Sequence, residues 1–405
     1  MSGESVFSAL RFRDFRNLWL GSLASYAGQW IQQATIAWLA YDMTGSSSLL
    51  GAIMGIRAIP MFLCAPFAGV AADRYDRRSL LLLSQLISAA TALIFGIVLA
   101  TGNAQVWHLF VFVVVSGVGA VMDRPVRLTV IFDLLPRETV MRAVALNMLA
   151  FSITRVGGPA VAGFLIGWAG AASNFFLQAA VYAIAMATAL LITFPAVAPR
   201  QRPSAFSELV AGLRYAWADR NARVLLAMGV LPFIFLVPIF SGLLPVYAKD
   251  VYHAGPEVLG LLLTSVGAGG VAGGWLAARC MRFPRQGLVQ ACAVFVMCAA
   301  FVVLAVAPTV ALACAALAAA GVGEMLHFTS SQATLQMSVP EAMRGRMASL
   351  QQLCPAFISL GVLAAGLLTD FMGVQLLTGL VAAVTAMLTA LLLMPRGGLG
   401  AVRVG

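Results

Sequence analysis

The chain has 405 residues, of which 61% are hydrophobic and only 10% charged, and its mean hydropathy is +0.94. Soluble domains carry about 25% charged residues, so this composition excludes a water-soluble globule and indicates an all-α integral membrane protein. The net charge of +10 comes from basic residues in short loops between apolar runs, which argues against nucleic acid as a partner. The six cysteines fall mostly inside apolar runs without metal-ligand spacing, so we interpret them as core residues and expect no metal and no cofactor.

About twelve apolar runs are long enough for membrane-spanning helices, which need about 20 residues. They lie near 17–41, 48–72, 79–101, 105–132, 140–167, 172–194, 223–247, 256–278, 286–307, 310–337, 345–369 and 374–394. A polar stretch at 195–221 divides them six and six. We therefore expect an N-terminal six-helix half at 1–194, a cytoplasmic linker at 195–221 and a C-terminal six-helix half at 222–405.

The linker itself carries apolar residues at helical spacing, namely Phe206, Leu209, Leu213 and Trp217. This period predicts an amphipathic helix that lies on the membrane surface.

Basic residues are distributed unevenly over the loops. With the N-terminus in the cytoplasm, 20 of the 25 basic residues fall in cytoplasmic segments, and Lys249 alone lies outside. The other four, within the membrane runs, are Arg57, Arg124, Arg127 and Arg155. Because basic loops remain in the cytoplasm, this bias predicts a multi-pass protein with cytoplasmic N- and C-termini, which we expect in a bacterial inner membrane.

The two halves repeat each other. Gly117–Gly119 matches Gly321–Gly323, and Pro136 matches Pro340, in each case 204 positions later. The fourth and tenth runs are therefore related copies. Six-helix halves repeated in parallel imply a pseudo-symmetric architecture with a binding site between the halves near the bilayer midplane.

The loop after the second run, Gly69 to Arg78, reads GVAADRYDRR. It resembles the loop motif G-x-L-A-D-R-x-G-R-K of the major facilitator superfamily, with Ala71 in place of Leu and Asp76 in place of Gly. A solvated basic turn between two membrane helices is the other interpretation of this stretch. The segments Phe12 to Ser25 and Asp133 to Glu138 also resemble the branch that contains macrolide-efflux-type drug exporters and the enterobactin exporter.

The superfamily resemblance implies a conformational latch between the halves. Asp73 would lie at the positive N-terminal end of the eleventh helix, and Arg77 would pair with Asp133 at the cytoplasmic end of the fourth. The latch implied in this way consists of Gly69, Asp73, Arg74, Arg77, Arg78 and Asp133. Such a latch favours the state closed to the cytoplasm.

Two acidic residues lie at membrane depth, where charge is costly and marks function. Asp123 can pair with Arg127 one turn on, either as a structural ion pair or as part of a functional site. Glu324 shares a helix face with His327, and burial of a carboxyl group favours its neutral form. We expect Glu324 to carry protons, His327 to tune it and Asp123 to be the next candidate; a neutral Glu324 bonded to His327 is the alternative.

Polar and aromatic residues of the first run suit a cavity wall for large, partly apolar ligands, although they also suit interhelical hydrogen bonding. Arg155 precedes a Gly-Gly-Pro run that partly resembles the helix-5 motif of superfamily antiporters, G-x-x-x-G-P-x-x-G-G. It either binds substrate or acts as a counter-ion for Asp123 or Glu324. The candidate cavity residues are Tyr26, Gln29, Trp30, Gln33, Arg57, Arg124, Arg127 and Arg155.

These features predict a secondary active transporter with the major facilitator fold and no enzymatic activity. It would export amphipathic, drug-like organic molecules in exchange for protons by alternating access. A dedicated siderophore or metabolite exporter is the alternative, and a membrane-integrated enzyme or a non-transporting sensor is the alternative of another class. The expected partners are a small-molecule substrate, protons and the lipid bilayer, and we expect a monomer.

Overall fold

The computed structural model describes residues 6–64, 76–194 and 205–393. In these ranges the chain forms helices and no strand. Eleven of the described helical segments are long and apolar enough to cross a membrane. They coincide with eleven of the twelve apolar runs, and the first run lies in α1 (Arg13–Thr44), a helix of 32 residues. The prediction of an all-α membrane fold is confirmed.

The chain divides into two compact units. One contains Met1–Met43 and Ile59–Arg202, and the other contains Thr44–Ala58 and Pro203–Gly405. The segment Thr44–Ala58, which belongs to the first half by sequence, therefore packs within the second unit.

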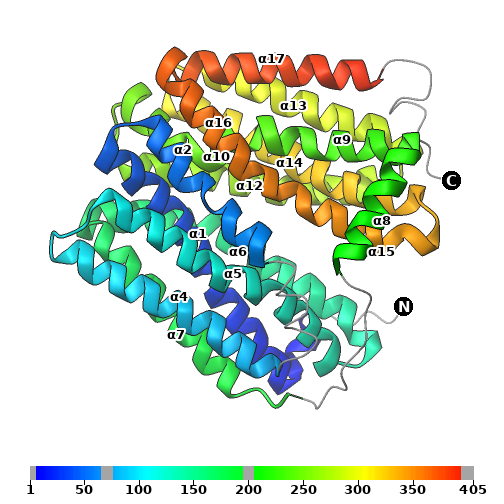
Figure 1. Cartoon of the computed structure of the whole chain (residues 1–405), viewed down its shortest axis with the longest axis horizontal. Coiled ribbons are helices and arrows are strands. Elements are labelled where there is room, and N and C mark those ends of the chain that lie inside the picture. Colours follow the sequence, from blue (N-terminus) through cyan, green and yellow to red (C-terminus); the bar gives the residue numbers. More distant parts are fainter. Residues whose placement is uncertain (1–5, 65–75, 195–204, 394–405) are drawn as a thin grey trace. The chain divides into compact units, whose positions relative to one another are not determined.

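The first unit is built from α1 and four further long helices. The elements are η1 (Val6–Arg11), α1, α4 (Arg77–Ala100), α5 (Val106–Leu134), α6 (Arg137–Ala169) and α7 (Ala171–Leu190). The helix α4 packs against both α5 and α7 (Figure 1). Phe95, Phe112 and Phe175, one from each of these three helices, are buried together with ring centroids 4.8–5.2 Å apart. This aromatic cluster fixes the relative positions of the three helices.

The start of α4 explains one departure from the superfamily loop motif. Asp76, where that motif usually has Gly, is the N-cap of α4 and accepts a 3.1 Å hydrogen bond from the backbone N–H of Ser79. Aspartate is among the best N-cap residues, because its carboxylate satisfies an N–H that lacks a partner within the helix.

The second unit is built around α12, α13 and α14. Its elements are α2 (Ser47–Gly55), α8 (Ala205–Ala218), α9 (Arg220–Phe235), α10 (Val237–Gly242), α11 (Leu244–Val246), η2 (Tyr247–Val251), α12 (Pro256–Cys280), α13 (Gln286–Val306), α14 (Val310–Ser338), α15 (Glu341–Leu353), η3 (Cys354–Ala356), α16 (Phe357–Met372) and α17 (Val374–Leu393). The helix α14 packs against α12, α13, α9 and α15, and α13 lies beside α17 (Figure 1). Pro238 lacks a backbone N–H, and the helix that ends as α9 resumes there as α10.

The linker contains the helix α8. On its surface Leu213 and Trp217 are 53% and 78% exposed, whereas Gly212 lies close to Leu350 of α15. One face of α8 thus packs on the second unit and another presents apolar side chains outward. Its position on a membrane surface stays a prediction.

The sequence repeat corresponds to the same close helix approach in each unit. A Cβ on Gly119 of α5 would lie 2.8 Å from Ser88 Oγ of α4. A Cβ on Gly323 of α14, 204 positions later, would lie 2.6 Å from Met297 Cγ of α13. Glycine is needed at both places because any side chain would push the paired helices apart.

The expectation that the cysteines are core residues holds for Cys298 and Cys354, which are buried. It is wrong for Cys292, which is exposed on α13. A single thiol on an apolar helix is compatible with a buried or an exposed position, so the sequence could not distinguish these two positions.

Candidate functional site

Asp123 and Arg127 on α5 form a buried ion pair in the first unit. Arg127 Nε donates to both carboxylate oxygens of Asp123, at 2.8 and 2.9 Å. The two residues are 2% and 1% exposed. The pair that the i,i+4 spacing predicts is therefore present, and it is shielded from water and lipid.

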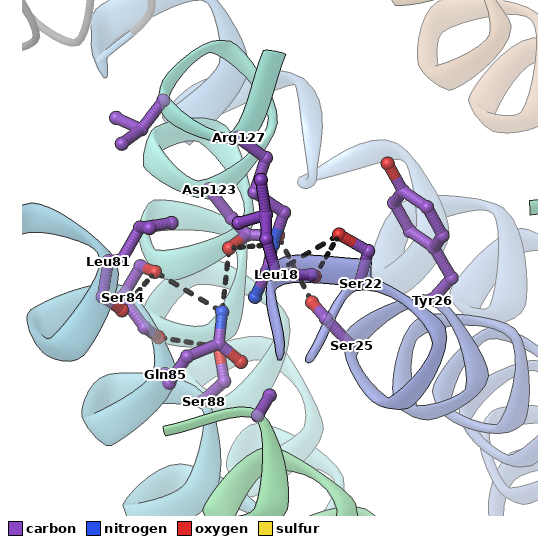
Figure 2. Close-up of polar contacts among 12 residues, drawn as sticks. Leu18, Ser22, Ser25, Tyr26, Leu81, Ser84, Gln85, Ser88, Asp123 and Arg127 are labelled. Carbon is purple, nitrogen blue, oxygen red and sulfur yellow. Dashed lines mark hydrogen bonds and ion pairs between the residues drawn. The ribbon is translucent and has the colours of Figure 1, made fainter. Parts of the chain in front are cut away.

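Two neighbouring helices complete the hydrogen bonding of this carboxylate, as Figure 2 shows. Ser25 of α1 donates to Asp123 Oδ2 at 3.1 Å, and Gln85 of α4 donates to Oδ1 at 2.7 Å. Each carboxylate oxygen thus accepts two hydrogen bonds, and a proton on either would displace a donor. Ser25 and Gln85 were not among the residues predicted from the sequence, where the available signal was a polar residue within an apolar run.

A second polar and aromatic group joins α1 to α6. Asn147 donates a 3.1 Å hydrogen bond to the hydroxyl of Tyr26. The Phe151 ring lies 5.6 Å from the rings of both Tyr26 and Trp30. The guanidinium of Arg155 lies 5.6 Å from the Trp30 ring, a cation–π contact, and Arg155 is only 8% exposed. The structure therefore brings three predicted cavity residues together and adds Asn147 and Phe151, which sequence reasoning missed.

The glutamines of α1 differ in their surroundings. Gln32 donates to Ser116 of α5 at 2.9 Å and accepts from the Tyr182 hydroxyl at 3.4 Å, so it joins three helices. Gln29 contacts Ser25 at 3.5 Å within α1. Gln29 and Gln33 are both half-buried. The interhelical interpretation thus applies to Gln32.

Two further predicted cavity residues are Arg57 and Arg124. Arg57 is half-buried in a turn that follows α2, in the second unit, whereas the sequence predicted one continuous apolar helix there. The side chain of Arg124 lies outside the described residues.

One pairing expected between the predicted latch residues is present in the structure. Arg77, at the start of α4, forms an ion pair with Asp133 near the end of α5. Arg78 donates a 3.0 Å hydrogen bond to the backbone carbonyl of Leu190. The remaining latch residues, Gly69, Asp73 and Arg74, lie outside the described residues. The pairing is a structural finding, and its role as a latch stays a prediction.

In the second unit, α14 carries Glu324 and His327 one turn apart. His327 is 1% exposed and Glu324 is half-buried. His327 stands 204 positions after Asp123, and Gln290 of α13 stands 205 positions after Gln85 of α4. The backbone groups of Gln290 and of Gly229 on α9 lie beside the His327 ring. Each unit thus buries a titratable residue at an equivalent place.

Comparisons with known proteins agree with this architecture. The profile of a family described as transmembrane secretion effectors matches residues 4–402. Macrolide efflux protein A of Streptococcus pyogenes is 22% identical over 89% of this chain and 90% of its own. Multidrug efflux pump Tap of Mycobacterium tuberculosis is 25% identical over 87% of this chain and 86% of its own.

The staphyloferrin A transporter of Staphylococcus aureus is 24% identical over 62% of this chain and 63% of its own length. Among solved structures, a bacterial homolog of the human lysosomal transporter Spinster superposes with a TM-score of 0.71. It shares 14% identity, and the match covers 94% of this chain and 95% of that one. This likeness supports the fold.

Proposed function

Because the chain belongs to the transmembrane secretion effector family of the major facilitator superfamily, we propose that it exports amphipathic organic molecules in exchange for protons. The observation that carries this proposal is the pair Glu324 and His327, one turn apart on the membrane-spanning α14. Ionisable groups at membrane depth are costly and mark ion and substrate pathways in transporters. The efflux named for the macrolide and multidrug relatives supports export over import.

In this proposal Glu324 takes up a proton on the outer side and releases it on the cytoplasmic side. Removal of a carboxyl group from water favours its neutral form, so protonation would let Glu324 cross between the two environments at lower cost. Asp123 suits this role less well, because four hydrogen bonds and the charge of Arg127 already hold its carboxylate.

Alternating access would arise from rocking of two six-helix halves in the bacterial inner membrane, with both termini in the cytoplasm and the protein acting as a monomer. The loop motif that ends in the first turn of α4 would bias the equilibrium between the two access states, because the ion pair between Arg77 and Asp133 joins the start of α4 to α5. A contact made in one state and lost in the other shifts the population toward the first.

The α1–α6 group supports an amphipathic substrate. Tyr26, Trp30 and Phe151 offer aromatic surface, and the Tyr26–Asn147 pair adds polar groups to it. A second candidate is a carboxylate-bearing siderophore. The guanidinium of Arg155 on Trp30 favours it, as does the similarity to the staphyloferrin A transporter.

Flux into proteoliposomes tests the proposal. The lumen is made more acidic than the medium, and erythromycin and staphyloferrin A serve as probes in parallel. Molecules oriented inside-out should accumulate a transported probe in the lumen, and a protonophore should stop this. Equal accumulation of the probe with and without the pH gradient would refute the coupling to protons. Accumulation of staphyloferrin A alone would favour the second candidate.

A further inference from the structure

A line of buried polar side chains runs along one face of α14. It begins at His327 and continues with Ser331, Thr334 and Ser338, at steps of four, three and four residues. The first three are at most 3% exposed. At 1.5 Å per residue the line is about 16 Å long, which is about half the thickness of the hydrocarbon core. It reaches the last residue of the helix.

Three other helices border this line. Gln351 of α15 donates a 3.1 Å hydrogen bond to Ser331 Oγ. Gln290 of α13 donates to the carbonyl of Ser330 at 3.4 Å. A Cβ on Gly229 of α9 would meet one atom within 4 Å, Ser331 Oγ at 3.2 Å, so glycine leaves that side of the hydroxyl uncrowded.

Several polar atoms along the line lack a hydrogen-bond partner within the described residues. They are Gln290 Oε1, Ser330 Oγ, Ser338 Oγ and Gln351 Oε1. Buried polar atoms in proteins are almost always hydrogen-bonded, and ordered water supplies the partner where the protein does not. The atoms are donors and acceptors from three helices, which is the environment that a buried water needs.

We propose that this line binds a chain of water molecules that conducts protons between His327 and the cytoplasmic end of α14. The inference rests on the proposed proton coupling and orientation, and it adds the route. Each transfer passes one proton between a nitrogen or oxygen and the next oxygen, and no heavy-atom bond changes. Serine, threonine and glutamine side chains do not gain or lose protons near neutral pH, so they position water and do not store protons.

His327 is the titratable residue at the start of the line, one turn from the proposed carrier Glu324. On α14 and the described helices packed against it, the other titratable groups that are not exposed are few: Glu324 and Cys314 on α14, Cys280 on α12, Cys298 on α13 and Cys354 after α15, together with Arg346 on α15, which stays charged. Thiols titrate well above histidine, which leaves His327 and Glu324 as the groups that the line would serve.

The test measures proton uptake and needs no transported substrate. Purified protein in detergent is shifted from about pH 8 to about pH 4, a range that extends below the usual one for histidine because burial disfavours a charged ring, and a pH-indicator dye follows uptake by stopped flow. His327→Asn should remove one phase of proton uptake. The double variant Ser331→Ala/Thr334→Val should slow that same phase by about tenfold, which is the effect of one lost hydrogen bond. The matched control is Thr385→Val/Thr389→Val, which removes two equally buried hydroxyls of α17 that, like the hydroxyl of Thr334, donate to their own helix.

A second pair of variants acts from other helices. Gly229→Ala should crowd Ser331 and slow the same phase, whereas Gly274→Ala on α12, where a Cβ has only an ordinary 3.6 Å contact, should not. Thr334→Ser keeps the hydroxyl and should behave as wild type. Uptake at the wild-type rate in both test variants, or a wild type without any His327-dependent phase, would overturn the inference. A failed flux assay beside an intact His327-dependent phase would instead count against the proposed export.

Discussion

The carboxylate of Asp370, near the end of α16, accepts a 2.9 Å hydrogen bond from the backbone N–H of Ser47, the first residue of α2. It also accepts from the N–H of Ser48 at 3.0 Å and from the hydroxyl of Ser46 at 3.1 Å. The first N–H groups of a helix have no partner within it, and their end of the helix dipole is positive. One carboxylate from α16 therefore caps α2, against which α16 packs along its length (Figure 1).

Asp370→Ala should loosen the packing of α2 on α16. The loss of a helix cap costs about 0.5–2 kcal/mol, so we expect a lower midpoint of thermal unfolding in detergent. Asp370→Asn keeps one acceptor oxygen without the charge and should fall between the alanine variant and wild type. An alanine variant as stable as wild type would show that the contact contributes nothing.

The Asp123–Arg127 pair is expected to behave as a structural unit. Removal of one partner leaves the other charge buried and should cost about 3–5 kcal/mol. Asp123→Leu and Arg127→Leu should therefore each lower the unfolding midpoint, whereas the double variant should be more stable than either single one. If the double variant loses as much as the two single variants added together, the pair is not coupled and this interpretation is wrong.

The fold was largely predictable because its signals are local. Apolar runs such as 286–307 coincide with α13 almost residue for residue, since helix formation in a membrane depends on hydropathy and length. The packing of α2 on α16 was not predictable, because Ser47 and Asp370 are 323 positions apart and no pattern links them.

The candidate site was predictable in part for the same reason. Asp123 and Arg127 are one turn apart, so spacing alone indicated the pair. Gln85 and Asn147 contact site residues from other helices, and only the helix packing brings them there. The pairing of Arg77 with Asp133 came from the superfamily resemblance, since these residues are 56 positions apart.

The latch makes a prediction about transport. Asp73→Asn and Arg77→Ala should each reduce transport while folding and substrate binding persist, because a latch biases a conformational equilibrium. Interactions of this kind are worth about 1–2 kcal/mol, or about a tenfold shift in population. The exchange Arg77→Asp/Asp133→Arg restores opposite charges and should recover transport that Arg77→Asp alone loses. Wild-type rates in Asp73→Asn and Arg77→Ala would refute the latch.

The orientation can be tested by thiol labelling in a variant without native cysteines. Phe283→Cys, in the exposed turn after α12, should be protected from an impermeant thiol reagent in intact cells. Glu257→Cys, in the exposed first turn of α12, should be labelled. Permeabilised cells provide the control, because both positions should then react. The opposite pattern would reverse the predicted topology.

The last prediction concerns the proton carrier itself. Glu324→Gln has nearly the shape of protonated glutamate but cannot release a proton. It should abolish accumulation driven by a pH gradient while leaving probe binding and exchange at equal pH measurable, because those steps need no net proton movement. Glu257→Gln, the same change at an exposed position in the first turn of α12, should transport as wild type does. If Glu324→Gln still concentrates the probe when only a proton gradient is supplied, Glu324 is not the carrier. Asp123→Asn then becomes the next variant to examine.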